Sequence, residues 1–210
     1  MRKALLSILL GIGLLASTAS NANVVVSAPN DHSAVYPWYL TVQLGYSSAD
    51  YTNAILRGGF AATRIDNSGL GYHLAIGYQF APHFSSEFGV VWFDKIQWHG
   101  ITGLPNGFKT KNNIVYFAGR ILLPLHFIPR LQFYIKGGIG WVARAGFTIN
   151  GVRVLSQRNY VMPVIGAGLL YRLAQHWTLE ASYIGVPSEG TYQLPWSNFI
   201  GFGGSVWFKV

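Results

Sequence analysis

The residues in this sequence whose types and spacing best suit chemistry are His83, Ser85 and Glu87, which alternate along one short segment. A serine becomes a nucleophile when a histidine takes its proton and a carboxylate orients that histidine. Alternate spacing on an extended segment also arises easily by coincidence. We therefore predict no catalytic residue and a protein that is not an enzyme, with hydrolysis at Ser85 as an alternative.

Other chemistry has less support in the sequence. The six histidines, at positions 32, 73, 83, 99, 126 and 176, show no metal-binding spacing, and there is no cysteine to form a disulfide or a thiolate metal site. No basic run or phosphate-cradling glycine loop indicates a nucleotide or nucleic acid. We expect no cofactor, no metal and no nucleic-acid partner.

The composition points to a membrane. The chain holds 13 Phe, 12 Tyr and 7 Trp, yet only 10% of its 210 residues are charged. Soluble domains average about 25% charged residues, so apolar surface must face something other than water.

The first 22 residues have the pattern of a secretory signal peptide. Arg2 and Lys3 precede an apolar stretch over 4–15, and small residues lead to Ala22, after which we expect cleavage. Past Ala22 no window of 18 apolar residues could form a spanning helix.

Period-two alternation of apolar and polar residues predicts strands instead. It is clear in 38–46, where Trp38, Leu40 and Val42 share one face. Eight such runs occur, most of them 8 to 14 residues long: 38–46, 70–80, 84–93, 114–125, 131–144, 160–172, 177–184 and 199–210. Strands of about 9 to 11 residues suit a membrane better than the 5 or 6 usual in soluble domains.

Long and short connections alternate strictly between these runs, which is typical of bacterial outer-membrane barrels with short periplasmic turns and long outer loops. The sequence therefore predicts an all-β protein, an eight-stranded antiparallel up-and-down transmembrane β-barrel. We expect a signal peptide over 1–22, a short periplasmic lead-in over 23–37 and the barrel over 38–210.

Charged residues in the strands must face the lumen, because a charge facing lipid costs about 2 to 4 kcal/mol near the membrane midplane. An eight-stranded barrel is just wide enough for side chains to fill. We expect Glu87 to pair with Arg120 and Lys136, and Glu180 to join Arg172. The expected lumenal charges are Glu87, Arg120, Lys136, Arg144, Arg172, Glu180 and Lys209. A structural network is the main interpretation, and a narrow, anion-preferring ion path is the alternative.

The four long loops are where a binding function is expected. Their basic candidates are Arg57, Arg64, Lys95, Lys109, Lys111, Arg153 and Arg158, which would attract lipopolysaccharide phosphates or anionic host polymers. Solvated loops without a ligand are an equal alternative. The loop apolar residues could contact another protein or fold over one another; they are Ile55, Leu56, Phe60, Ile101, Leu104 and Phe108.

Several stretches resemble a known family: "PWYLTVQLGY", "SSEFGVVWFD", "FAGRILLPL", "PVIGAGLLYRL" and "HWTLEASY". From Trp38 to Val210 the chain is similar to the small outer-membrane barrels of the OmpA and OmpX type. This resemblance implies the outer membrane of a Gram-negative bacterium and a structural, adhesion or host-interaction role.

Two further resemblances concern partners and activity. The closing "GGSVWFKV" resembles the strand signal read by the barrel-assembly machinery, although the family usually ends in Phe or Trp and this chain in Val210. His83, Ser85 and Glu87 resemble the His-x-Ser element and Glu of outer-membrane lipid A deacylases, which makes lipid A modification the enzymatic alternative.

The signal-peptide prediction is tested by the mass of the chain purified from outer membranes. We expect a mature protein that begins at Asn23, because the small residues before it suit the cleavage site. A purified chain that retains Met1 and the apolar stretch would contradict it.

Overall fold

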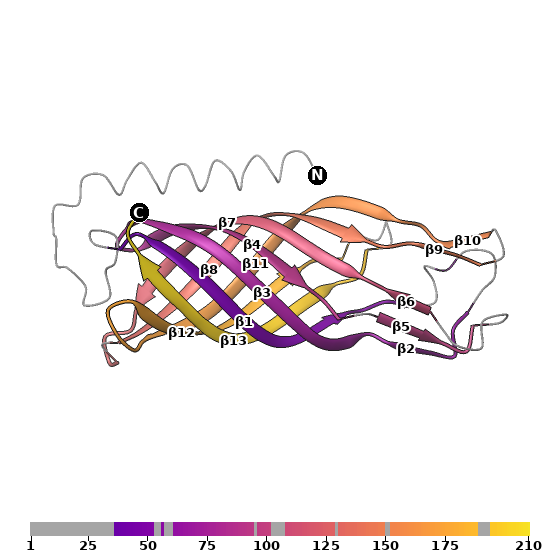
Figure 1. Cartoon of the computed structure of the whole chain (residues 1–210), viewed down its shortest axis with the longest axis horizontal. Helices are drawn as coiled ribbons and strands as arrows, with labels where there is room; N and C mark the ends of the chain where they lie inside the picture. Colours follow the sequence, from indigo (N-terminus) through magenta and orange to yellow (C-terminus); the bar gives the residue numbers. More distant parts are fainter. Residues whose placement is uncertain are drawn as a thin grey trace.

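The computed structural model describes residues 36–52, 56, 61–94, 96–101, 108–128, 130–149, 152–188 and 194–210. Its centre is a closed antiparallel barrel with the strand order β1-β13-β12-β11-β8-β7-β4-β3 (Figure 1). The barrel strands are β1 (Trp38–Ala49), β3 (Ser68–Ala81), β4 (Phe84–Trp92), β7 (Asn112–Pro124), β8 (Leu131–Arg144), β11 (Arg158–Arg172), β12 (Trp177–Val186) and β13 (Ser197–Phe208). The predicted fold class is confirmed, and each predicted run corresponds to one barrel strand. The structure describes no helix that is long and apolar enough to cross a membrane.

In the barrel, the apolar residues of the alternating pattern face outward and the polar residues face the interior. On β1 the outward side chain of Val42 is 54% exposed, whereas that of the adjacent Gln43 is 1% exposed and faces the lumen. Successive side chains of a strand point to opposite faces, so one apolar row meets lipid while the polar row fills the interior. Outward tryptophans lie at strand ends, with Trp92 at the end of β4 and Trp177 at the start of β12.

The long connections at one end of the barrel contain strands of their own. β2 (Arg64–Asp66), β5 (Ile96–His99) and β6 (Phe108–Thr110) form a three-stranded sheet, and β9 (Phe147–Ile149) pairs with β10 (Val152–Leu155). These strands extend past the barrel at the end opposite the C-terminus (Figure 1). We call them, together with the residues packed between them, the cap.

The cap has a hydrophobic core separate from the barrel interior. Trp98 lies at its centre with no exposed surface, and residues from both cap sheets pack around it. The core consists of Ala49, Tyr51, Ala62, Ile96, Trp98, Ile101, Ile149, Val154 and Leu155, with Leu56, Ile65 and Phe108 packed against it. For Leu56, Ile101 and Phe108 the structure confirms that loop apolar residues fold over one another. Ile55, Phe60 and Leu104 lie outside the described residues.

Inside the barrel, three tyrosines lie directly opposite glycines on the neighbouring strand. The register pairs Tyr39 with Gly77, and in the same way Tyr116 with Gly89 and Tyr134 with Gly168. A Cβ atom at Gly77 would lie 2.0 Å from Cζ of Tyr39. The missing side chain therefore lets the ring lie across the neighbouring strand and carry its hydroxyl toward the middle of the lumen.

We expect Gly77→Ala to destabilise the barrel by about 1 to 3 kcal/mol, because the added methyl group overpacks the interior against Tyr39. The measurement is urea unfolding of the chain refolded into lipid vesicles. Gly119→Ala is the matched control, since no atom lies within 4 Å of the Cβ it would add. Equal stability of the two variants would contradict this account of the tyrosine and glycine pairs.

Candidate functional site

Glu87 on β4 lies at the centre of a polar network inside the barrel. Its side chain is 1% exposed, and its Oε2 lies 2.6 Å from Nη1 of Arg120 while its Oε1 lies 2.8 Å from Nζ of Lys136. Tyr116 donates a hydrogen bond of 2.5 Å to Oε1, and Tyr39 one of 3.3 Å to Oε2. A buried carboxylate needs such partners, because its charge has lost the hydration of water.

Arg120 on β7 links this carboxylate to a second one on the far side of the barrel. Its Nη2 lies 3.6 Å from Oε1 of Glu180 on β12, and its guanidinium carbon lies 3.9 Å from the ring centre of Tyr134. Tyr134 and Ser205 donate hydrogen bonds to Glu180 over 2.6 and 3.1 Å. We call these residues the interior network: Tyr39, Glu87, Tyr116, Arg120, Tyr134, Lys136, Glu180 and Ser205.

The interior network joins six of the eight barrel strands, since its members lie on β1, β4, β7, β8, β12 and β13. It continues onto β3 through His73, whose Nε2 is hydrogen-bonded to the hydroxyl of Tyr116 over 2.7 Å. His73 Nδ1 is hydrogen-bonded to Gln43 Oε1, which also accepts from Ser182. Polar contacts therefore cross the lumen as well as follow the wall.

Two other expected lumenal charges, Arg144 and Arg172, lie near the ends of their strands. Arg144 is buried at the cap end of β8 and donates to the carbonyl of Ser156 over 3.2 Å. Arg172 is half-buried at the opposite end of β11, opposite Thr178 in the register. Glu180 has a partner that was not expected, because the long Arg120 side chain reaches it across the lumen.

The expectation that Lys209 faces the lumen is wrong. β13 ends at Phe208, which is the last residue paired with β1, and Lys209 is exposed. The alternation of inward and outward side chains holds only for residues paired between strands. Lys209 lies beyond the last pair of β1 and β13, so its side chain can turn to solvent.

The tyrosines of the interior network were not predicted from the sequence. Tyr39, Tyr116 and Tyr134 are almost completely buried and supply hydrogen bonds to the two carboxylates. Their signal in the sequence is an aromatic residue at an inward position whose cross-strand neighbour is a glycine. Reading that signal requires the register between strands, which the periodicity of one strand does not give.

The contacts of the candidate nucleophile Ser85 do not support serine catalysis. His83 is exposed at the turn before β4, and its Nδ1 is hydrogen-bonded to the carbonyl of Leu122 over 3.1 Å. Ser85 is buried, with its Oγ 3.5 Å from the hydroxyl of Tyr39. Glu87 is engaged by Arg120 and Lys136, so these three residues do not form a relay from carboxylate to histidine to serine.

Basic residues are exposed on the cap and where the cap meets the barrel strands. Arg64, Lys109, Lys111 and Arg158 are exposed. The backbone of Arg153 lies in β10, whereas Arg57 and Lys95 lie outside the described residues.

Asp66 of β2 makes two polar contacts in the cap sheet, one within β2 and one to His99 of β5. Arg64 Nε donates to Oδ1 of Asp66 over 2.8 Å, and Nε2 of His99 is hydrogen-bonded to Oδ2 over 2.9 Å. The hydrogen bonds from Arg64 and His99 hold the pKa of Asp66 below its usual value, so Asp66 stays ionised at neutral pH. Within the cap core, burial raises the pKa of Tyr51 to about 12 and keeps its phenol neutral beside Trp98.

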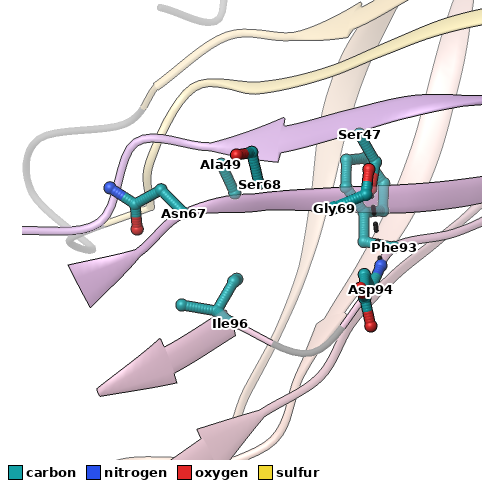
Figure 2. Close-up of a pocket in the computed structure, with 8 residues that line it drawn as sticks. All are labelled: Ser47, Ala49, Asn67, Ser68, Gly69, Phe93, Asp94 and Ile96. Carbon is teal, nitrogen blue, oxygen red and sulfur yellow. Dashed lines mark hydrogen bonds between the residues drawn. The ribbon is translucent and has the colours of Figure 1, made fainter. Parts of the chain in front are cut away.

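A small pocket lies where the barrel meets the cap (Figure 2). It is lined by Ser47, Ala49, Asn67, Ser68, Gly69, Phe93, Asp94 and Ile96, which leave no room for a water molecule. Ser47 accepts a hydrogen bond from the backbone N–H of Asp94 and donates one to the carbonyl of Gly69. The pocket is a packing site where the cap ends of β1 and β3 meet the segment that follows β4. The described residues contain no group of three or more His, Asp or Glu side chains that could hold a metal ion.

The profile of the OmpA-like transmembrane domain matches residues 33–193 of the chain. The chain belongs to this family. It is therefore a β-barrel protein of the bacterial outer membrane, surrounded by membrane lipid, and its cap lies on the side of the long loops.

Solved structures of distant sequence share this fold. The attachment invasion locus protein Ail of Yersinia pestis, solved with the heparin analogue sucrose octasulfate, is 13% identical with a TM-score of 0.52; the match covers 82% of this chain and 99% of that one. Neisserial surface protein A is 12% identical with a TM-score of 0.52, over 81% and 97% of the two chains. None of the curated proteins matches this sequence.

Glu87→Gln should destabilise the folded barrel by about 3 to 5 kcal/mol, because it leaves Arg120 and Lys136 buried beside a neutral side chain. Urea unfolding in lipid vesicles measures this loss. Adding Lys136→Met to Glu87→Gln should recover part of the stability, since it removes one uncompensated charge.

The control is Asp66→Asn, which breaks an ion pair in the cap that water screens and should change barrel stability little. A Glu87→Gln protein as stable as the wild type would show that the interior network does not hold the barrel together.

Proposed function

We propose that this protein is a sealed barrel without enzymatic activity that holds a folded binding surface, the cap, above the outer membrane. It takes a structural or host-interaction role, and the barrel-assembly machinery inserts it. This proposal rests on the hydrophobic core around Trp98. Loops that only connect strands do not need such a core, so an ordered cap indicates a surface with a function of its own.

Two properties of the interior support a sealed barrel in place of an ion path. Arg120 contacts carboxylates that belong to β4 and β12, so its side chain crosses the lumen. Opening a path would require breaking ion pairs in a region of low dielectric constant, where separated charges are costly.

The positions of the candidate catalytic residues support a role without catalysis. Ser85 is buried beside Tyr39, and His83 contacts the backbone of Leu122. Both lie near the barrel end opposite the cap, whereas lipid A lies in the outer leaflet, on the cap side. A deacylase needs its nucleophile within reach of the substrate ester.

The charge of the cap favours an anionic partner. Arg64 and Arg158 are exposed and lie on different parts of the cap end. A sulfated polysaccharide is a suitable ligand class, since its closely spaced anions can contact several basic side chains at once. Ail, which shares the fold, was solved with a heparin analogue, and this makes heparin a practical probe.

The proposal is tested by heparin binding of the full chain folded in detergent micelles. We expect binding that weakens with salt, and a loss of about 5-fold or more for the double variant Arg64→Gln and Arg158→Gln. Trp98→Ala should weaken binding too, because it removes the core that orders the cap. The matched control is Arg130→Gln with Lys209→Gln, which removes two exposed charges at the opposite end of the barrel.

Equal losses for the cap variant and the control would show that binding follows net charge alone and would contradict a cap site. The enzymatic alternative is checked separately by mass spectra of lipid A from cells with and without the protein. We expect identical spectra, and an acyl chain lost or gained would overturn the proposal of a protein without enzymatic activity.

A further inference from the structure

The three-stranded cap sheet has a buried face and an exposed face, and Arg64 and His99 lie on the exposed one. Ile65 of β2 pairs with Trp98 of β5, and both pack in the cap core, so this row of the sheet faces inward. Side chains of a strand alternate between the two faces of a sheet. The rows on either side therefore face outward, with Arg64 directly opposite His99 and with Asp66 two residues along β2.

Asp66 holds the two basic side chains together. Its Oδ1 accepts from Nε of Arg64 over 2.8 Å, and its Oδ2 accepts from Nε2 of His99 over 2.9 Å. The side chains of Arg64 and His99 are nevertheless 75% and 43% exposed, so a ligand can reach both. The contact with Asp66 uses one of the five N–H donors of the guanidinium. Since both side chains contact one carboxylate, a single anionic group or two adjacent ones can contact both.

The backbone of His99 is fixed at the end of β5. The N–H and the hydroxyl of Thr63 both donate to the carbonyl of His99, over 2.9 and 3.2 Å. The next residue, Gly100, has a φ of 63°, which glycine adopts most easily, and a Cβ atom there would lie 2.1 Å from Oγ1 of Thr63. β5 therefore ends at His99 with its carbonyl held, and the imidazole stays beside Asp66.

The charge of this group of three side chains changes between neutral and mildly acidic pH. The hydrogen bond from Arg64 is the main cause that holds the pKa of Asp66 below its usual value, so Asp66 stays ionised over this range. An ionised carboxylate only accepts, so at neutral pH His99 carries its proton on Nε2 and the group has no net charge. When Nδ1 also gains a proton, the group becomes positive and Nδ1 becomes a donor.

His99 is the side chain of this exposed face that changes charge between about pH 5 and pH 8. In the described part of the chain, the strands packed against β5 carry the charged residues Arg64 and Asp66 on β2 and Lys109 on β6. Arginine and lysine keep their charge over this range. The other described histidines lie in the barrel or in its short turns: His73, His83, His126 and His176.

The row of Arg64 and His99 lies above the lipid headgroups. Tyr72 of β3 is an outward aromatic residue near the cap end and is paired with Trp92. Such residues mark the membrane interface, and a tilted strand climbs about 2.5 Å per residue, so Arg64 lies roughly 20 Å above Tyr72. The headgroup layer is only about 5 to 8 Å thick. The exposed face of the cap sheet is therefore within reach of a soluble polymer.

We propose that Arg64 and His99 form a binding site for the sulfate groups of a polysaccharide, and that this site binds more tightly at mildly acidic pH than at neutral pH. Arg64 supplies a permanent charge, and His99 adds a second charge and a second donor when it is protonated. The sulfate groups stay ionised throughout, so the change in affinity arises in the protein. The inference rests on the function proposed for the cap and adds a specific site and its control by pH.

The test measures heparin binding of the full chain folded in detergent micelles, at about pH 7.5 and about pH 5.5 in the same salt. We expect the wild type to bind about 5-fold more tightly at the lower pH, because a charge is added at the site. His99→Gln should lose most of this difference and keep the weaker affinity. His99→Arg should bind tightly at both pH values, because its charge is permanent.

The matched control is His126→Gln, since His126 is exposed in the turn between β7 and β8 at the opposite end of the barrel. This variant should retain the full pH dependence. The proposal is overturned if His99→Gln keeps the pH dependence of the wild type, or if His126→Gln loses as much of it. Wild-type binding that does not change with pH would overturn this inference alone, whereas no heparin binding at either pH would overturn the proposed function of the cap as well.

Discussion

The structure depends on one buried carboxylate. Glu87 lies inside a barrel whose outer face must be apolar, and it is held by Arg120 and Lys136 at distances of 2.6 and 2.8 Å. Lipid outside the wall cannot stabilise a charge, and the eight-stranded lumen is too narrow to hydrate one fully. The charges must therefore satisfy one another across the barrel, and the positions of the surrounding tyrosines and glycines follow from that requirement.

The same constraint separates the molecule into two parts with different cores. In the barrel, polar side chains fill the inside and apolar ones meet lipid, whereas in the cap Trp98 and its neighbours are buried and the basic residues face water. The change occurs within single strands: β1 carries the lumenal Gln43 and ends at Ala49 in the cap core. A chain that leaves the membrane can again bury its apolar residues, and this is why long loops can form an ordered surface.

Much of the barrel could be predicted from the sequence because its signal is local. Alternation over 38–46 or 70–80 gives both the strand and its lipid-facing side, and the cost of a charge in lipid points Glu87, Arg120 and Lys136 inward. The cap strands could not be predicted in this way. β2 and β5 are three and four residues long, and their pairing of Arg64 with His99 joins two different loops. The contact of Arg120 with Glu180 could not be predicted for a related reason, since the reach of Arg120 across the lumen depends on the closed barrel and not on neighbouring positions in the sequence.

We infer that the interior network seals the barrel, so that function resides in the cap. The most direct test is single-channel recording of the folded wild-type chain in planar lipid bilayers. We expect no stable conductance above the bare membrane, because Arg120 and its two carboxylates close the lumen. Sustained open-channel currents with an ohmic dependence on voltage would contradict it and would make the lumen itself the functional site.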